Sequence, residues 1–257
     1  MIFRDSVRNF FVMIELELRR LRHDRTELYF RAVQPILWIV IFAPVMSAIR
    51  AIPTPGGIPY IDFMTPGVLI QSTTFLSIFY GLMMVWERDS GILKKLLVTP
   101  ASRYATVIGR SMASGVRAIF QGLIVIPVAL LMSVKFIPNA AYFVSAFVII
   151  FFSSGGFAAI SIIAASFMKT RERFMGIGQA IIMPLFFASN ALYPVEMMPQ
   201  ILKDFSAVNP LSYVVDAVRG LLITGDLSNL PIDLAAIAIF DVVLFILASI
   251  SFKRIIE

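Results

Sequence analysis

Apolar residues fall into long stretches along the chain, and charged or turn-forming residues separate these stretches. A helix needs about 20 apolar residues to cross a hydrocarbon core of about 30 Å. Six stretches approach that length, and they predict transmembrane helices over Ala32–Ile49, Gly67–Val85, Ser111–Val134, Tyr142–Met168, Phe174–Leu192 and Leu234–Phe252. The pattern therefore predicts an all-α membrane protein with one domain over residues 1–257, in which residues 32–192 hold spans one to five and residues 232–257 hold span six and a cytoplasmic tail.

Residues 1–31 carry a different pattern, with apolar residues at helical spacing and a basic opposite side. The apolar positions are Val7, Phe10, Phe11, Ile14, Leu18 and Leu21, and the polar positions are Arg8, Glu15, Arg19 and Arg22. We expect a cytoplasmic helix in the membrane interface, with its basic face toward anionic headgroups or a partner protein. Whether it is only an anchor stays open.

The link between spans two and three contains a second amphipathic pattern, over Ser90–Pro100. Leu93, Leu96 and Leu97 share one side with Ile92, whereas Lys94 and Lys95 lie on the other. Pro100 favours the end of the helix. The pattern predicts a short cytoplasmic helix whose apolar face is buried against the bundle, the interface or another protein.

Residues 193–231 are too apolar for a solvated loop. Pro199 opens one predicted short helix, and Asn209 with Pro210 supplies an N-cap and a first residue for a second one, which Gly225 ends. At roughly 13 residues the second helix is too short to span, so we expect a re-entrant hairpin outside the cytoplasm. Asp216 and Arg219, three positions apart, are placed to form an ion pair.

The composition agrees with lipid as the solvent: 59% of the residues are hydrophobic, 15% are charged, and the mean hydropathy is +0.87. Without cysteine, and with His23 as the one histidine, the chain lacks disulfides, thiolate metal sites and cysteine nucleophiles. A glycine-rich phosphate loop followed by Lys and Ser or Thr is also missing. We therefore expect no enzyme activity, no metal site and no cofactor bound by this chain.

Lysine and arginine are distributed unevenly around the predicted spans. The net charge is +6, and only Arg50, Lys135, Lys203 and Arg219 lie on the side opposite the N-terminus. Positive loops resist translocation, so both termini are expected in the cytoplasm of a multi-pass plasma-membrane protein. The basic pI near 9.8 thus reflects topology, and no nucleic-acid partner is expected.

Three polar residues inside the predicted spans are candidate intramembrane sites: Asp241, Arg117 and Gln71. A carboxylate at mid-membrane costs about 2.5–3.5 kcal/mol, so Asp241 is expected to face a partner or a cavity. Arg117 is one candidate partner, although its side chain also has the length to reach the cytoplasmic surface. A structural role and a role in a substrate or proton path stay open for Asp241. The small residues of span four, from Ser153 to Ser166, are expected to pack against other helices.

Three segments carry a resemblance to a known family. They are Trp86–Leu96, which reads WERDSGILKKL, Tyr193–Pro199, which reads YPVEMMP, and Asn209–Gly220, which reads NPLSYVVDAVRG. Together with the six-span layout and the N-terminal helix, they resemble ABC-2 type transporter permeases over essentially the whole chain. The Asn209–Gly220 segment is the most specific part.

The resemblance implies a homodimer, with each chain seated on a separate ATPase subunit that holds ATP and magnesium. It implies an ATPase-coupling loop made by Glu87, Arg88, Gly91, Leu93, Lys94, Leu96 and Leu97. It also implies an exit gate in the hairpin, made by Pro194, Pro199, Asn209, Pro210, Tyr213, Asp216 and Arg219.

The function implied by the resemblance is the export of drugs or other small amphipathic molecules, because the loops are most similar to daunorubicin-resistance permeases. Export of a lipid-linked polysaccharide by the same fold is the alternative within the family. Two further functions stay open on the residues alone: a proton-coupled secondary transporter that uses Asp241, and a membrane scaffold without transport activity.

Overall fold

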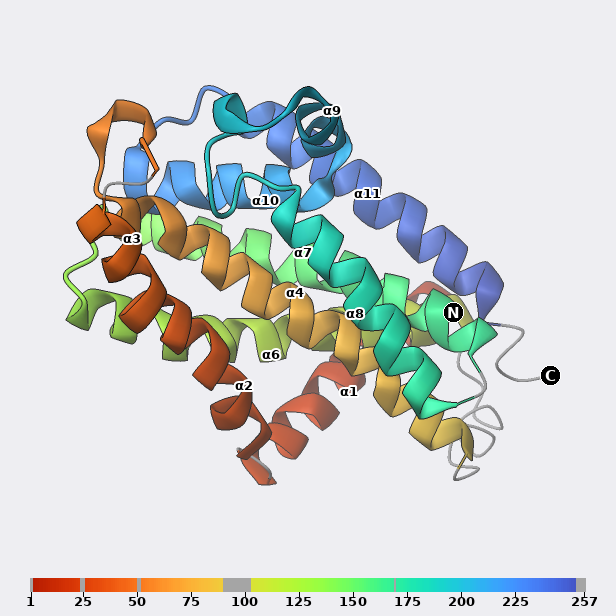
Figure 1. The fold of residues 1–257 in the computed structure, drawn as a ribbon. Coiled ribbons are helices and arrows are strands. Elements are labelled where there is room, and N and C mark those ends of the chain that lie inside the picture. Colours follow the sequence, from red (N-terminus) through yellow and green to blue (C-terminus); the bar gives the residue numbers. More distant parts are fainter. Residues whose placement is uncertain (1, 24–25, 50–51, 90–102, 169, 253–257) are drawn as a thin grey trace.

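The computed structural model describes residues 2–23, 26–49, 52–89, 103–168 and 170–252, and every regular element among them is helical (Figure 1). The helices of eight or more residues are α1 (Ile2–His23), α2 (Thr26–Leu37), α4 (Tyr60–Asp89), α6 (Arg103–Leu131), α7 (Ala140–Phe167), α8 (Arg171–Phe187), α9 (Gln200–Val208), α10 (Pro210–Arg219) and α11 (Leu230–Ser251). The short helix α3 (Ala43–Ile49) continues α2 through a π-helical turn, Trp38–Phe42. The helix predicted over Ser90–Pro100 lies outside the described residues.

Four helical stretches are long and apolar enough to cross a membrane: Tyr29–Ile49, Thr106–Leu131, Ala140–Phe167 and Leu230–Ser251. They match the first, third, fourth and sixth predicted spans to within a few residues. Helices α4 and α8 occupy the positions predicted for the second and fifth spans, and both pack against α7. Pro35 lies inside α2 without ending it, and the π-helical turn then joins α2 to α3, so the first stretch is continuous.

Helix α8 ends at Phe187, before the predicted end of the fifth span at Leu192. Pro184 lies in its last turn, and the backbone N–H of Ala188 closes the helix on the Pro184 and Phe186 carbonyl oxygens. The residues that follow form turns, and Ala191 and Leu192 are buried. Continuous hydrophobicity over this region therefore reflects buried turns as well as a helix.

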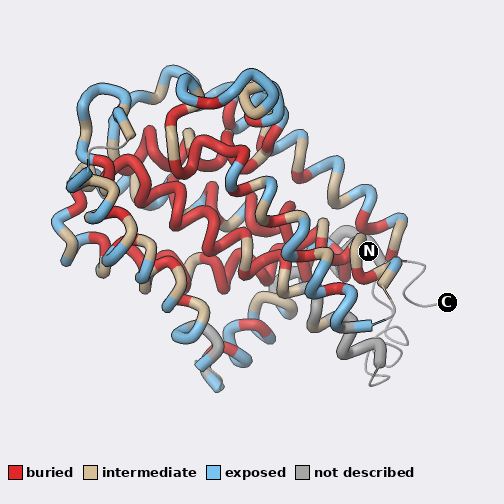
Figure 2. Tube along the Cα trace, in the orientation of Figure 1, coloured by how far each residue is buried: buried red, intermediate tan, exposed pale blue. Residues whose placement is uncertain are grey.

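The core is formed by α4, α6, α7 and α10, which lie inside the bundle in Figure 2, while α2 and α11 lie at its edges. In the most apolar stretch of 18 residues in α7, 67% of the residues are buried, whereas 22% are buried in the corresponding stretch of α11. Exposed residues of α11 such as Ile239, Val242 and Ile250 are apolar. The outer helices therefore present hydrophobic surface, as expected for a bundle that faces lipid.

The small residues of α7 pack against neighbouring helices, as predicted. Every residue from Ser153 to Ala159 is buried. A side chain on Gly155 would meet Met112 of α6, and one on Gly156 would overlap the Asp241 carboxyl group of α11. The glycines therefore allow close approach of two helices on α7.

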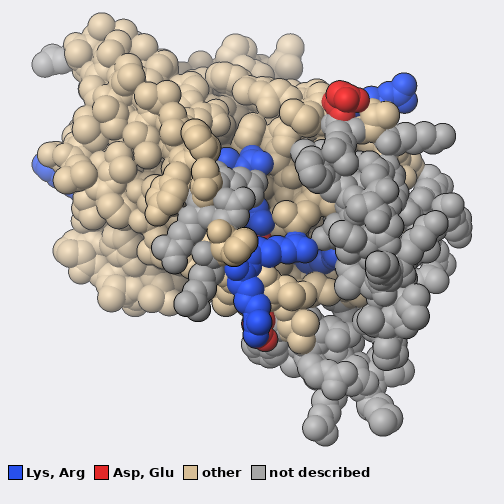
Figure 3. Space-filling view, turned by 90° about the horizontal axis from the view of Figure 1, so that it is seen from below, with Lys and Arg blue, Asp and Glu red and all other residues tan. Residues whose placement is uncertain are grey.

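Helix α1 is amphipathic, but its contact with the bundle differs from the predicted one. Leu21 packs with Leu76 of α4 and Val116 of α6, and Glu17 on the same side is buried. Leu18, expected on the apolar face, is 44% exposed. The side of α1 that faces the bundle thus includes a carboxylate, while Lys and Arg side chains gather across the lower side of the molecule (Figure 3).

Candidate functional site

Asn209 joins the ends of two helices in the predicted hairpin. Its Oδ1 accepts a hydrogen bond from the Leu211 N–H at 3.0 Å and so caps α10, with Pro210 as the first helical residue. Its Nδ2 donates to the carbonyl oxygens of Leu185 and Ala188, at 2.7 and 3.2 Å, at the end of α8. The predicted N-cap is confirmed, and the same side chain also satisfies carbonyls that helix α8 leaves unpaired.

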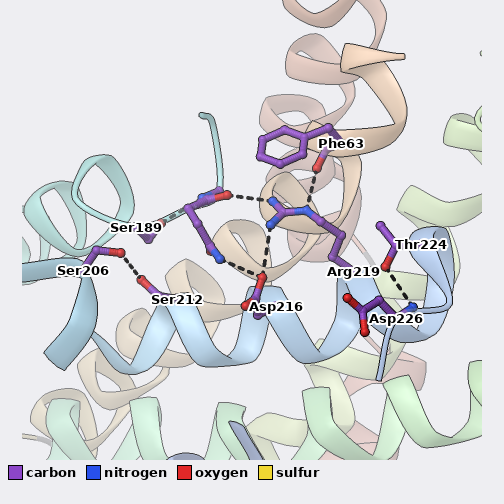
Figure 4. Close-up of polar contacts among 10 residues, drawn as sticks. Phe63, Ser189, Ser206, Ser212, Asp216, Arg219, Thr224 and Asp226 are labelled. Atoms are coloured by element: carbon purple, nitrogen blue, oxygen red, sulfur yellow. Dashed lines mark hydrogen bonds and ion pairs between the residues drawn. The ribbon is translucent and has the colours of Figure 1, made fainter. Parts of the chain in front are cut away.

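Arg219, in the last turn of α10, is buried among groups from three parts of the chain. Its guanidinium lies 3.9 Å from the centroid of the Phe63 ring, and its Nε donates to the Phe63 carbonyl oxygen at 3.2 Å. Its Nη2 donates to the Asn190 carbonyl oxygen at 2.7 Å (Figure 4). Because Phe63 belongs to α4 and Asn190 follows α8, Arg219 ties α10 to both.

Asp216 completes this cluster. Its Oδ1 lies 3.5 Å from Nη1 of Arg219, as predicted from the spacing, and accepts a hydrogen bond from Asn190 Nδ2 at 2.9 Å. Burial raises the pKa of the Asp216 carboxyl, while Arg219 and the Asn190 hydrogen bond act in the opposite direction. Burial also lowers the pKa of the Arg219 guanidinium to about 10, which leaves it charged at neutral pH.

Two small cavities lie beside the cluster, between the hairpin and the start of α11. One, of about 190 Å³, is lined in part by Arg219 and Asp226, and the other, of about 200 Å³, in part by Lys203 and Tyr213. Both are also lined by Asp216, Asn229 and Asp233. Polar side chains therefore surround the space between the hairpin and α11.

Helix α9 is attached to α10 by side-chain hydrogen bonds. The hydroxyl groups of Ser206 and Ser212 lie 3.0 Å apart, and the Tyr213 hydroxyl donates to the Ala207 carbonyl oxygen. Pro194 precedes a 3-10 turn, Val195–Met197, and Pro199 directly precedes α9. Gly225 ends the segment in the left-handed conformation, with φ of 73°, as predicted. The hairpin residues named from the sequence thus belong to one connected structure.

A buried ion pair joins α1 to the bundle. Arg117 of α6 pairs with Glu17 of α1, and the Tyr80 hydroxyl of α4 donates to the second Glu17 oxygen at 2.9 Å. Arg117 therefore pairs with Glu17 and not with Asp241, which is one of the two possibilities that the sequence leaves open. Glu17 was not identified as its partner because it lies among apolar positions of an amphipathic helix. Its place between Ile14 and Leu21, on the side that faces the bundle, is the signal that reveals it.

The other polar residues predicted inside the membrane are buried. Gln71 is 1% exposed in α4, and its Oε1 has no hydrogen-bond partner among the described residues. Asp241 is 6% exposed, and its Oδ1 likewise has no partner in the described part of the chain. Within the same residues, no group of three or more His, Cys, Asp or Glu side chains is placed to hold a metal ion.

The predicted coupling residues fall mostly outside the structure described. Glu87 and Arg88 lie in the last turn of α4, which the structure describes only as backbone. Gly91, Leu93, Lys94, Leu96 and Leu97 lie outside the described residues. Their role therefore stays a prediction.

Similarity to known proteins extends over most of the chain. Residues 8–223 match the family described as ABC-2 type transporter. The chain is 25% identical to "Putative transport permease ycf38" of Cyanophora paradoxa, over 98% of this chain and 90% of that protein. It is 28% identical to "Probable multidrug ABC transporter permease YbhR" of Escherichia coli K12, over 61% of this chain and 42% of that protein.

A third relative is "Probable doxorubicin resistance ABC transporter permease protein DrrC" of Mycobacterium tuberculosis H37Rv. The identity is 25%, over 75% of this chain and 69% of that protein. Because the family match covers far more than half of the 257 residues, the chain belongs to the ABC-2 type transporter family, whose members are membrane permease subunits of ABC transporters.

Proposed function

We propose that this chain is the transmembrane subunit of an ATP-driven exporter that moves small amphipathic molecules out of the cytoplasm or the inner leaflet. The observation that carries the proposal is the match of residues 8–223 to a family of transport permeases. In this proposal α4 and α8 cross the bilayer together with the four apolar stretches, which gives six crossings with both termini in the cytoplasm. Two copies assemble in the plasma membrane with two ABC ATPase subunits, which bind ATP and magnesium.

Two relatives support a drug-like cargo. The names of the E. coli and M. tuberculosis proteins include the words multidrug and doxorubicin resistance, and both proteins are permeases. We therefore prefer amphipathic drugs to lipid-linked polysaccharides as the cargo.

The ion pair between Glu17 and Arg117 supports a role for α1 in energy coupling. A movement of the ATPase subunits would reach α1 and the end of α4, where Glu87 and Arg88 lie. Because Glu17 contacts both α4, through Tyr80, and α6, through Arg117, such a movement would be passed directly into two buried helices. Charged groups at the cytoplasmic surface suit the docking step, since they steer and orient a partner.

The contacts of Asn209 and Arg219 support a gate at the opposite end. Asn209 attaches the hairpin to the end of α8, and Arg219 attaches it to the start of α4. A displacement of either long helix would therefore move α10. In this proposal the hairpin opens and closes the outer exit as α4 and α8 shift.

The test is transport by the chain co-expressed with its ABC ATPase subunit. We expect a stable complex and ATP-dependent accumulation of doxorubicin inside inverted membrane vesicles. A catalytically inactive ATPase subunit is the matched control, and Glu87→Ala with Arg88→Ala should uncouple ATP hydrolysis from transport. Uptake that follows a pH gradient without the ATPase would overturn the proposal in favour of a secondary transporter, and failure to form any ATPase complex would favour a scaffold.

A further inference from the structure

A groove on the outer surface of the bundle lies between α6, α7 and α11. Its volume is about 460 Å³, within the range of pockets that hold drug-sized ligands. Val148, Phe152 and Val242 line it and are 48%, 50% and 57% exposed, respectively. Because the bundle lies in lipid, the groove opens toward the hydrocarbon.

Asp241 lies in the floor of this groove. Its carboxyl group is against Gly156 of α7, where a Cβ would overlap it, and its Oδ1 accepts no hydrogen bond from any described residue. The groove is lined by Asp241 together with Ile108, Met112, Val148, Ile149, Phe152, Leu234, Ile237, Ala238, Val242 and Phe245. In the described part of the chain, the lining thus includes one acidic residue and no cationic one.

The surroundings of Asp241 match one class of ligand. An unpaired polar group in hydrocarbon costs several kcal/mol, typically about 2–7, and a cation held in the groove beside the carboxyl group would offset part of this cost through its charge. Phe152 and Phe245 offer aromatic surface for a cation or an apolar body, and Met112 fills irregular gaps. The ionised carboxylate would repel an anion, and a neutral ligand would lack the charge that attracts a cation to it.

We propose that this groove binds lipophilic cations that partition into the membrane, with the positive charge next to Asp241 and the apolar body between Phe152 and Phe245. The step from ligand to cargo rests on the proposed function, since it makes such cations substrates of the exporter. The binding itself does not depend on that step.

The experiment uses the permease–ATPase complex in lipid nanodiscs and two probes of equal shape and opposite charge, tetraphenylphosphonium and tetraphenylborate. Both are permanently charged, so their protonation does not affect the comparison. We expect saturable tetraphenylphosphonium binding above the partition into empty nanodiscs. Asp241→Asn should weaken it about tenfold or more, equivalent to about 1.4 kcal/mol, and should leave tetraphenylborate partition unchanged.

Two further variants separate binding from folding. Asp226→Asn makes the same chemical change in an exposed loop and should leave binding unchanged. Val242→Trp fills the exposed side of the groove while Asp241 remains, and it should also abolish saturable binding. If Asp241→Asn fails to fold, Val242→Trp provides the decisive comparison.

The proposal is overturned if Asp241→Asn or Val242→Trp binds tetraphenylphosphonium as the wild type does, or if the wild type shows no saturable binding. ATP-driven doxorubicin uptake measured on the same preparations reports on the proposed function separately. Uptake without saturable phosphonium binding would overturn the groove alone. Saturable binding without ATP-driven uptake would overturn the exporter and leave the groove supported.

Discussion

Glu17 of the amphipathic helix α1 forms an ion pair with Arg117 of α6, and only 2% and 6% of the two side chains, respectively, are exposed. Tyr80 of α4 donates a hydrogen bond to the same carboxylate, and the Arg117 guanidinium lies 5.2 Å from the centroid of the Tyr80 ring. A helix that the sequence places at the membrane surface is therefore attached to two core helices through buried charges. Removing either side chain breaks this ion pair in a low-dielectric environment.

We predict that Glu17→Ala and Arg117→Ala each destabilise the protein by about 3–5 kcal/mol, because each breaks a buried ion pair. The double variant Glu17→Ala with Arg117→Ala should lose much less than the sum of the single losses. The measurement is a double-mutant cycle on the denaturation of the detergent-solubilised complex.

The matched control for this cycle is the exposed pair of Glu15 and Arg19, at 2.7 Å on the same helix. Glu15→Ala should change stability by less than about 0.5 kcal/mol, since exposed pairs four residues apart contribute little. Single losses at Glu17 and Arg117 that are as small as the loss at Glu15 would contradict the assignment of α1 as a firmly attached element.

Local features of the hairpin could be predicted from the sequence, whereas the contacts between distant helices could not. Asn209, Pro210 and Gly225 act on their own backbone or on neighbouring residues, so their residue types are enough to place the ends of α10 and of the turn after it. The ion pair of Asp216 and Arg219 follows from helical spacing in the same way.

The partner of Arg117 shows the limit of this reasoning. Glu17 and Arg117 are 100 residues apart, and Arg219 and the Phe63 carbonyl are 156 residues apart. Hydrophobic periodicity gives the apolar face of each helix but not which faces meet. Asp241 is a candidate partner because it is conspicuous in an apolar span, whereas nothing in the sequence shows that Glu17 of the interfacial helix faces α6.

At Asn209, serine should preserve stability better than aspartate. Asn209→Ser keeps an acceptor for the α10 N-cap and loses the donor to α8, so a loss of about 1 kcal/mol is expected from the missing hydrogen bonds. Asn209→Asp also keeps the cap, but it places a carboxylate next to the Leu185 and Ala188 carbonyl oxygens at the negative end of α8. Aspartate should therefore be worse than serine here, although both are good N-cap residues.

Thermal denaturation of the two Asn209 variants, with wild type and Asn209→Ala alongside, measures this order. Stability of Asn209→Asp equal to or above that of Asn209→Ser would mean that the α8 carbonyl oxygens do not repel a carboxylate at this position. Wild-type stability of Asn209→Ser would mean that the Nδ2 hydrogen bonds to α8 contribute nothing.

The hairpin should also depend on pH through Asp216. Its folded-state pKa is raised above the ordinary value, mainly by burial, so the folded protein binds the proton more tightly than the unfolded chain does. The carboxyl therefore stabilises the fold most at low pH, and stability falls as pH rises from about 3.9, the ordinary value, through the raised folded pKa. Asp216→Asn should remove this decline.

Asp226 provides a comparison of opposite sign, because hydrogen bonds from the Ser228 backbone and side chain lower the pKa of its carboxyl. Its contribution is present above the ordinary pKa and is lost as pH falls through the lowered value. Stability curves measured between acidic and neutral pH for both asparagine variants test the two signs. Identical shapes for wild type and Asp216→Asn would refute the role assigned to burial of Asp216.

Gly156 of α7 should be sensitive to the smallest side chain because the Asp241 carboxyl group occupies the space that a Cβ would need. We predict that Gly156→Ala destabilises the protein by about 1–3 kcal/mol, as overpacking does, and that Asp241→Ala in the same chain restores part of the loss. Gly176→Ala on α8 is the matched control, since a Cβ there meets no atom within 4 Å. That change should be neutral or stabilising by up to about 1 kcal/mol through helix propensity alone. Unfolding midpoints of Gly156→Ala, Asp241→Ala, the double variant and Gly176→Ala test this. Equal effects at Gly156 and Gly176, or a double variant whose loss is the plain sum of its parts, would show that α11 does not approach α7 through Asp241.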